Sequence, residues 1–392
     1  MNSFLFKKRI VIAVHYLIDS APQAMRDYIR SNSDATLLYL SHPLPGVNPD
    51  KKEVTYGELS IGEKVTKRYK APVRFQSLLL SLLLEFVLTI YWVFNQKKSF
   101  DVFIGIDNFN ALQGLILKKM GKVKKVVYYT IDYFPTRYEN KLLNDMYHAI
   151  DKFCVKHADE TWNVSAEMVA ARERHNKMKR KEYNRQFTMP IGVWYDKVHR
   201  LPFSKINKKK LFFVGHLVPH MGADLIITAL PEIIRKIPDI HVDIVGGGEE
   251  LERLKALAKG KNVSSSITFW GWVRDRKKLE TIMKDAAVGL ATFNTDILDA
   301  KVKNADPMKI KDYMLMGMPV IATNALKNHK VIEEKKCGLI IPFQSHQLSN
   351  AVTSLLTNQK KLALYRNNAL SYVQQFDYEV LFRDNLGRIL QK

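Results

Sequence analysis

The sequence has few cysteines, few acidic residues and no uninterrupted hydrophobic segment of membrane-spanning length. Its 392 residues include two cysteines, Cys154 and Cys337, which lie far apart and match no metal-ligand spacing. This excludes a disulfide-stabilised secreted domain and a structural zinc module, and it favours a reduced, cytoplasmic setting. Asp and Glu number 39 against 61 Lys and Arg. No Asp-x-Asp pair follows an N-terminal strand, so we expect no metal requirement and no cofactor.

One hydrophobic run, residues 75–94 (FQSLLLSLLLEFVLTIYWVF), has about the length of a bilayer-spanning helix. Glu85 lies at its centre, Gln76 and two serines interrupt it, and basic residues flank both sides. A carboxylate at a bilayer centre costs roughly 2.5 kcal/mol or more. The pattern favours a helix that is buried in the N-terminal half, or that dips its apolar face into a membrane surface, over a true span.

The excess of basic residues gives a net charge of +22, and these residues are clustered. One cluster contains Lys67, Arg68 and Lys70, and another contains Lys118 and Lys119. Such clusters attract anionic lipid, phosphorylated substrates or nucleic acid. The basic residues are not interleaved with aromatic residues in a known module, so we expect no nucleic-acid partner. A membrane or acceptor contact and an ordinary solvated basic face remain open as alternatives.

Strand and helix patterns alternate along both halves, which indicates βαβ units and an α/β fold with parallel sheets. In the first half we expect strands at 9–14, 35–39, 102–106, 125–131 and 162–164, helices at 22–30, 111–120, 141–155 and 166–179, and a polar loop through Lys70. In the second half we expect strands at 211–214, 241–245, 267–270, 288–292 and 319–322, helices at 223–235, 250–258, 277–285 and 310–316, and a helical end at 348–392 with a break near Phe376.

The length of the chain predicts two domains, and the Pro- and Gly-containing stretch 189–202 indicates the linker. We expect Rossmann-like domains at 1–195 and 196–375, a cleft between them, and a final helix (376–392) that packs back on the first domain. Ligands of open parallel sheets bind outside the carboxyl ends of strands. His15, Asp107 and Asp132 follow such strand ends.

Three segments of the second half combine a strand end with residues suited to a phosphate. VGHLVPHMG (214–222) places Gly215 and His216 between a strand and a helix, and VGGGEE (245–250) places Gly246 and Gly247 likewise. These glycines allow a phosphate to approach the backbone, or they are ordinary turn residues.

The third segment, DPMKIKDYMLMGMPVIA (306–322), starts a helix at Pro307. Lys309, which follows Met308, shares one helix face with Asp312. A lysine at this position could bind a diphosphate, and the aspartate could bind the hydroxyls of a ribose. The alternative is that the two side chains form an ion pair on the surface.

In this order, with FWGWV (269–273) and Cys337-Gly338-Leu339, the segments resemble the C-terminal nucleotide-binding domain of GT-B glycosyltransferases of the group 1 or family 4 type. The resemblance covers about residues 208–345. It implies a GT-B fold and a hexosyltransferase that uses a nucleotide-sugar donor. A UDP- or GDP-sugar is the first candidate for this donor. In that case the N-terminal domain binds a glycan or polyprenyl-linked acceptor, on the inner face of the membrane, for polysaccharide or glycoconjugate synthesis.

The resemblance also implies individual roles. Lys309 contacts the donor diphosphate, Asp312 contacts the ribose, and the Gly246 turn lies near the donor sugar. The base of the nucleotide lies near Val273 and Arg274.

Three positions depart from the retaining group of this fold. His216 and Met221 stand where that group carries Arg and Lys, and Asn304 stands where it carries a Glu eight residues before the ribose acid. The inverting glucuronosyltransferase of xanthan assembly, which the chain resembles more weakly, lacks that Glu as well. Inversion is favoured. A retaining transferase, a sugar-nucleotide epimerase and an inactive nucleotide-sugar-binding scaffold are the alternatives.

An inverting transfer needs a general base near the acceptor hydroxyl. Asp132 is the first candidate, because it follows the strand at 126–131 directly. Asp107 is second and His15 third, from the equivalent positions after their own strands. The alternatives are a turn-capping Asp and a core or capping His.

Overall fold

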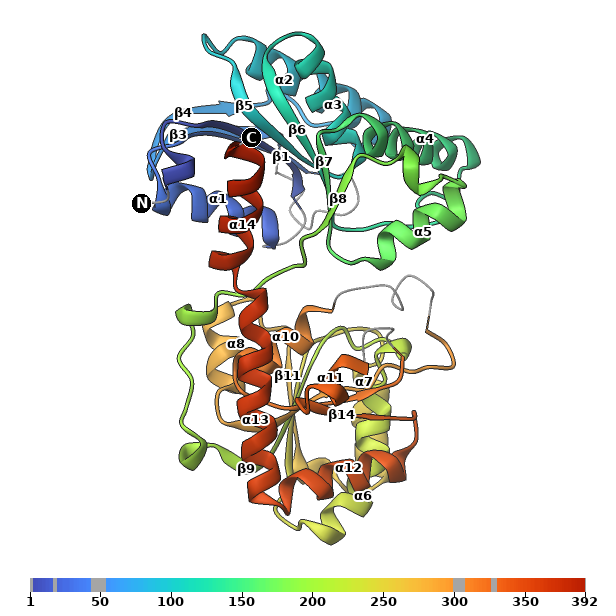
Figure 1. Cartoon of the computed structure of the whole chain (residues 1–392). Helices are drawn as coiled ribbons and strands as arrows, with labels where there is room; N and C mark the ends of the chain where they lie inside the picture. The colour runs from blue at the N-terminus through green and yellow to red at the C-terminus, as the bar shows by residue number, and fades with distance from the viewer. Residues whose placement is uncertain (1–2, 17–19, 44–53, 299–306, 326–329, 392) are drawn as a thin grey trace. The chain divides into compact units, whose positions relative to one another are not determined.

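The computed structural model describes residues 3–16, 20–43, 54–298, 307–325 and 330–391 (Figure 1). The chain divides into two compact units. The first consists of Met1–Gly192 together with Tyr378–Lys392, and the second of Val193–Asp377. Each unit has its own sheet with helices on both faces.

The first unit is built on an eight-stranded sheet in the order β4-β3-β2-β1-β5-β6-β7-β8, parallel from β2 to β8. Its strands are β1 (Arg9–Tyr16), β2 (Thr36–Pro43), β3 (Tyr56–Ile61), β4 (Lys64–Lys70), β5 (Phe100–Ile106), β6 (Val123–Thr130), β7 (Glu160–Asn163) and β8 (Arg185–Thr188). Its α-helices are α1 (Ala21–Asn32), α2 (Leu78–Phe94), α3 (Asn108–Lys119), α4 (Lys141–His157), α5 (Glu167–Asn176) and α14 (Tyr378–Gln391).

Helices α2, α3 and α4 cover one face of this sheet, where Trp92, Leu117 and Val155 belong to one buried cluster with the strands. Helices α1 and α14 pack together on the opposite face, with the rings of Tyr28 and Phe382 5.3 Å apart (Figure 1). The last helix of the chain therefore completes the core of the first unit.

The polar loop predicted through Lys70 is wrong, because β3 and β4 form an antiparallel hairpin there. The pattern KVTKRYK reads as polar because β4 is the edge strand of the sheet and is exposed along most of its length. Lysines on an edge strand also oppose pairing with another sheet, which gives the basic cluster a structural role.

The second unit has a six-stranded parallel sheet in the order β11-β10-β9-β12-β13-β14. Its strands are β9 (Asn207–Val214), β10 (His241–Val245), β11 (Ile267–Gly271), β12 (Ala286–Ala291), β13 (Val320–Thr323) and β14 (Gly338–Ile341). Its α-helices are α6 (Ala223–Lys236), α7 (Leu251–Gly260), α8 (Arg276–Met283), α10 (Met308–Leu315), α11 (Lys330–Glu334), α12 (Ser345–Leu356) and α13 (Gln359–Val373).

Helices α6, α7 and α12 bury their apolar faces on one side of this sheet. Helices α8, α10, α11 and α13 cover the other side. The break predicted near Phe376 is confirmed, because α13 ends at Val373 and α14 begins at Tyr378. In the described ranges, no helix is both long enough and apolar enough to cross a membrane.

Candidate functional site

The sheet of the second unit reverses its strand order between β9 and β12, and in such sheets ligands bind beyond the carboxyl ends of the strands at this reversal. At this edge β9 ends at Val214 and continues into Gly215. Helix α10 is fixed across it by the hydroxyl of Tyr313, which accepts a hydrogen bond from Val214 N (2.9 Å) and donates one to Leu290 O (3.1 Å). The helix that carries Lys309 and Asp312 is thus held at the ligand-binding edge.

Lys309 lies against the loop that follows β9. Its ammonium is 4.7 Å from the ring centroid of Phe213 and 4.6 Å from that of Phe293. It lies 3.6 Å from the sulfur of Met221, and a Cβ added to Gly215 would come within 2.9 Å of it. The structure therefore brings together two of the three segments that the sequence singled out.

Burial lowers the pKa of Lys309 to about 7. Among the residues that the structure describes, no carboxylate pairs with this ammonium. The aromatic rings offer only a weak electrostatic substitute for a counter-ion. A buried cation without an anionic partner marks a place where a ligand would supply the negative charge.

Asp312 forms an ion pair with Arg276, a residue that the sequence did not single out. Arg276 Nη2 lies 2.7 Å from Asp312 Oδ1, and Arg276 Nε lies 2.8 Å from Glu280. Burial opposes the charge of Arg276, but the two carboxylates outweigh it and raise its pKa. Arg276 comes from α8, 36 residues before Asp312, so no local pattern could have paired them.

The glycines of the second segment pack tightly against the first loop. Gly246 has φ 141°, and a Cβ there would lie 1.9 Å from Gly215 O. A Cβ on Gly247 would lie 2.4 Å from the indole nitrogen of Trp272. Backbone packing alone accounts for these glycines, so they locate the edge of the sheet without identifying a ligand.

The remaining residues expected at this site lie on its rim. His216 is exposed and contacts Trp272 edge-to-face, with ring centroids 4.6 Å apart. Val273 packs against the core beside α10, and Arg274 is exposed. Met308, half-buried, packs against the same core. Asn304 and Asp306 lie outside the described residues.

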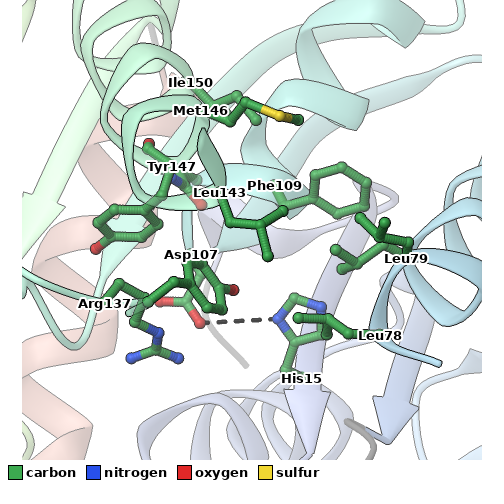
Figure 2. A pocket seen from close by; sticks show the side chains of 13 residues that line it. His15, Leu78, Leu79, Asp107, Phe109, Arg137, Leu143, Met146, Tyr147 and Ile150 are labelled. Atoms are coloured by element: carbon green, nitrogen blue, oxygen red, sulfur yellow. Dashed lines mark hydrogen bonds and ion pairs between the residues drawn. The ribbon is translucent and has the colours of Figure 1, made fainter. Parts of the chain in front are cut away.

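The first unit has a pocket at its own strand-order reversal, between β1 and β5. The lining consists of His15, Leu78, Leu79, Leu82, Asp107, Asn108, Phe109, Arg137, Tyr138, Leu143, Met146, Tyr147 and Ile150. Figure 2 shows His15, Asp107 and Arg137 gathered at one end of this pocket, while Met146 and Ile150 lie at the other. The pocket is therefore polar at the strand ends and apolar between the helices.

His15 is held between two carboxylates. Its Nε2 lies 2.9 Å from Glu85 Oε1 and its Nδ1 lies 3.8 Å from Asp107 Oδ2 (Figure 2). Burial alone would lower the pKa of His15, but Glu85 and Asp107 outweigh it and raise the pKa to about 10. At neutral pH the ring therefore carries both N–H groups and has no lone pair with which to accept a proton.

Asp107 lies directly after β5 and has a strained backbone, with φ 69° and ψ 163°. This region is populated almost only by glycine, and a side chain there costs about 1–3 kcal/mol. Asp107 N donates to Tyr129 O at 3.0 Å, which ties the residue to the neighbouring strand. Such strain is found preferentially at functional sites.

Asp132 lies two residues beyond the end of β6, on an exposed loop and outside the pocket lining. Desolvation by the surrounding protein and the negative charge of Asp107 raise the pKa of Asp132, whereas the positive charge of Arg137 lowers it. The charges of Asp107 and Asp132 likewise raise the pKa of Arg137 against burial. The two acids and Arg137 therefore form one electrostatic group at the polar end of the pocket.

Helix α2 turns an apolar stripe to solvent beside this pocket. Leu83 and Tyr91 are both 61% exposed, and Leu79, Leu80, Val87 and Phe94 are also exposed. At 100° per residue these six side chains occupy one side of the helix. Six large exposed apolar side chains on one helix are unusual for a surface that remains in water.

The basic clusters are partly neutralised by ion pairs. Lys118 Nζ lies 2.7 Å from Asp159, and Arg68 Nε lies 3.2 Å from Glu58. Lys67 lies 5.0 Å from the ring centroid of Tyr69, and Lys119 and Lys70 are exposed. Lys122 Nζ lies 4.4 Å from the ring centroid of Phe94, at the C-terminal end of the apolar stripe.

The comparisons with known proteins agree with this geometry. Residues 197–371 match the sequence model of the family described as glycosyl transferases group 1. An uncharacterized glycosyltransferase of Haemophilus influenzae is 26% identical over 185 residues, 47% of each chain. The GDP-mannose-dependent alpha-(1-6)-phosphatidylinositol monomannoside mannosyltransferase of Mycobacterium tuberculosis is 27% identical over 184 residues, 44% of this chain and 47% of that protein. The chain thus spans about half the length of these curated relatives.

Two solved structures match the chain as a whole. Sucrose-phosphate synthase from Thermosynechococcus elongatus gives a TM-score of 0.67 at 15% identity over 98% of both chains. HepE of Anabaena, solved in complex with UDP, gives 0.64 at 14% identity over 98% of this chain and 99% of that one. The expected GT-B fold is therefore confirmed, and the second unit is similar in sequence to the glycosyl transferases group 1 over residues 197–371.

Proposed function

We propose that this protein is a glycosyltransferase that moves a sugar from a nucleotide-sugar donor to a hydroxyl of an acceptor. The observation that carries the proposal is Lys309, a cation for which the described residues supply no carboxylate, at the strand-order reversal of the sheet that resembles the group 1 transferases. A donor diphosphate supplies the charge that this ammonium lacks. The ribose hydroxyls of the donor hydrogen-bond to Asp312, which the contact with Arg276 orients.

We assign the stabilisation of the leaving group largely to Lys309, because His216 and Met221 stand where the retaining group that the chain resembles carries Arg and Lys. As the diphosphate leaves, negative charge grows at its oxygens, and a fixed cation in a dry site stabilises that charge. Proteins similar to this chain are named for GDP-mannose, and a structural neighbour binds UDP. We therefore propose a GDP- or UDP-sugar as donor.

The acceptor enters the pocket of the first unit. This pocket is polar where β1 and β5 end and apolar along α2 and α4. A sugar on a polyprenyl carrier matches both parts, since its hydroxyl needs a carboxylate and its chain an apolar path. The acceptor is thus proposed to be a lipid-linked glycan, and an inverting displacement is favoured with a carboxylate of the polar group as base.

A membrane surface is the proposed location of this acceptor. The exposed stripe of α2 would leave water by entering the lipid interface, and each large apolar side chain gains on the order of 1.5 kcal/mol when fully buried. Lys122 at the end of the stripe and the exposed lysines of β4 then face anionic head groups.

The test is a thermal-shift screen with UDP-, GDP- and ADP-sugars. One of these donors should raise the melting temperature of the wild type, because a ligand that binds only the folded state stabilises it. Asp312→Asn should reduce that rise, and Asp239→Asn, a surface acid paired with Lys209, should leave it unchanged. If none of the donors raises the melting temperature, the proposal is wrong.

A further inference from the structure

Glu85 is an ionisable residue that neither the sequence motifs nor the proposed donor site explains. It lies at the centre of α2, the most apolar helix of the first unit, yet it is only 1% exposed. At 100° per residue it points away from the middle of the exposed stripe of Leu83 and Val87. The helix therefore presents an apolar face to the outside and a single buried carboxylate to the inside.

Among the described residues, the buried carboxylate pairs with one side chain of opposite charge, His15. Both of its oxygens lie within hydrogen-bond distance of His15 Nε2, at 2.9 and 3.1 Å. His15 Nδ1 faces Asp107. Glu85 comes from α2, His15 from β1 and Asp107 from the residue before α3, so the imidazole lies between two carboxylates. Figure 2 shows the end of this line in the pocket, where His15 and Asp107 face each other.

Other ionisable groups near His15 do not take the place of Glu85 as the partner of its Nε2 atom. His42 on β2 is buried, its ring centroid is 6.2 Å from that of His15, and burial lowers its pKa to about 4, so it stays neutral. Arg137 and Asp132 act on Asp107 from the opposite side of the pocket's polar end. Glu85 is therefore the carboxylate that sets the orientation and charge of His15.

We propose that Glu85 is a positioning residue: it fixes His15 as an imidazolium, and His15 in turn holds the carboxylate of Asp107 as the base for the acceptor hydroxyl. This proposal rests on the glycosyltransferase function proposed above. Asp107 has three features that Asp132 lacks: it lines the pocket, follows a strand at the reversal, and is held in a strained conformation.

The reaction balances as follows. An oxygen of Asp107 takes the proton of the acceptor hydroxyl while the acceptor oxygen bonds to the anomeric carbon of the donor. The bond between that carbon and the diphosphate oxygen breaks, and its electron pair leaves with the nucleoside diphosphate. His15 keeps both of its protons throughout, so it orients Asp107 and balances its charge without entering the proton transfer.

The first arm of the test needs no substrate. In the full chain labelled with ¹⁵N-histidine, the two ring nitrogens of His15 should keep the imidazolium signature up to about pH 9, because its pKa is about 10. In Glu85→Gln the ring of His15 should lose a proton at clearly lower pH than in the wild type. In Glu85→Asp the pH of this proton loss should lie between those of the wild type and Glu85→Gln. Glu58→Gln, which removes a carboxylate paired with Arg30 and Arg68, is the control and should leave His15 unchanged.

The second arm measures release of nucleoside diphosphate from the donor that gives the largest thermal shift, with water or a lipid-linked sugar as acceptor. Glu85→Gln should lower kcat about 10- to 100-fold with the donor KM unchanged, and the alkaline limb of the pH–rate profile should move to lower pH. Asp107→Asn should abolish turnover, and Asp239→Asn, a surface acid paired with Lys209, should retain the wild-type rate.

The outcomes are distinguishable. If a folded Glu85→Gln keeps the wild-type kcat and pH profile, or if a folded Asp107→Asn retains turnover, the positioning role is wrong while the transferase stands. If the wild type turns over no donor, the proposed function fails, and the histidine spectra still report whether Glu85 sets the state of His15.

Discussion

Two residues, Lys309 and Asp107, have features that cost free energy and that the proposed function would explain. Burial opposes the charge of Lys309, which has no carboxylate partner among the described residues, and Asp107 adopts a backbone conformation suited to glycine. Proteins retain such unfavourable features where a ligand or a reaction benefits from them. At the scale of single residues, both are therefore better evidence for a functional site than a match to a sequence motif.

Replacing Lys309 by Met should weaken nucleotide-sugar binding roughly 10- to 100-fold, since a hydrogen bond to a charged group contributes about 1.5–3 kcal/mol. Isothermal titration of the donor measures this, with the exposed Lys277→Met as matched control. The affinity of the wild type should be highest below pH 7 and fall above it, because the pKa of Lys309 is about 7 and the ammonium must then be protonated on binding. A pH-independent affinity between 6 and 9 would contradict this role.

Asp107→Gly should have a free energy of unfolding about 1 kcal/mol higher than Asp107→Ala, because glycine relieves the backbone strain. Asp107→Ala keeps the strain and loses the same carboxylate, so it is the matched comparison. Chemical denaturation of the two variants gives the difference. Both should lose donor turnover, and an Ala variant as stable as the Gly variant would show that the strain has no energetic consequence.

At the scale of elements, α2 combines two roles on opposite sides. Its outer side is an apolar stripe, and its inner side contributes Glu85, which pairs with the pocket residue His15. Its length of 17 residues and its central charge are unsuited to a bilayer span, and a helix lying in the lipid interface fits both sides at once.

Changing Leu83 and Val87 together to Ser should reduce binding to anionic vesicles at least tenfold, because two side chains of the stripe no longer gain from leaving water. Vesicle co-sedimentation at low salt is the measurement. Leu364→Ser removes an exposed leucine of the second unit and should bind like the wild type. Equal binding by all three proteins would mean that the stripe does not contact lipid.

Changing Glu85 to Gln should lower the free energy of unfolding by about 3 kcal/mol near neutral pH, the cost of breaking a buried ion pair. The pKa of His15 is raised from 6.5 to about 10 in the folded state. The contribution of the His15–Glu85 pair to the free energy of unfolding is therefore complete below pH 6.5 and is lost as the pH rises through 10. Denaturant unfolding at pH 6.5, 8 and 10 should show the difference between wild type and variant shrinking, and a constant difference would count against the pair.

The sequence predicted the α/β fold and its main helices and strands because buried strands such as β9 and β12 are continuous apolar runs. It missed the β3–β4 hairpin, since an edge strand exposed along most of its length lacks an apolar face. It singled out Lys309 and Asp312 as candidates because both lie on one helical turn, and their role in donor binding stays a prediction. It missed Arg276 and Glu85, whose partners are 36 and 70 residues away. Contacts across such distances depend on tertiary packing, which no local pattern records.

At the scale of the whole molecule, each unit has one candidate site, and both lie at the strand-order reversal of their sheets. The second unit contributes a cation and an acid suited to a nucleotide diphosphate. The first contributes a carboxylate group and an apolar pocket suited to an acceptor on a lipid. The net charge of +22 favours both partners, because the donor and the membrane surface are anionic.

The most direct test of the whole account is the release of nucleoside diphosphate from UDP- and GDP-sugars in the presence of anionic vesicles that contain a polyprenyl-diphosphate-linked sugar. The account predicts that the wild type releases the nucleotide and that the sugar appears on the lipid in equal amount. Lys309→Met should lose both products. Donor binding without turnover would instead support an inactive scaffold, and transfer by Lys309→Met at the wild-type rate would contradict the proposed donor site.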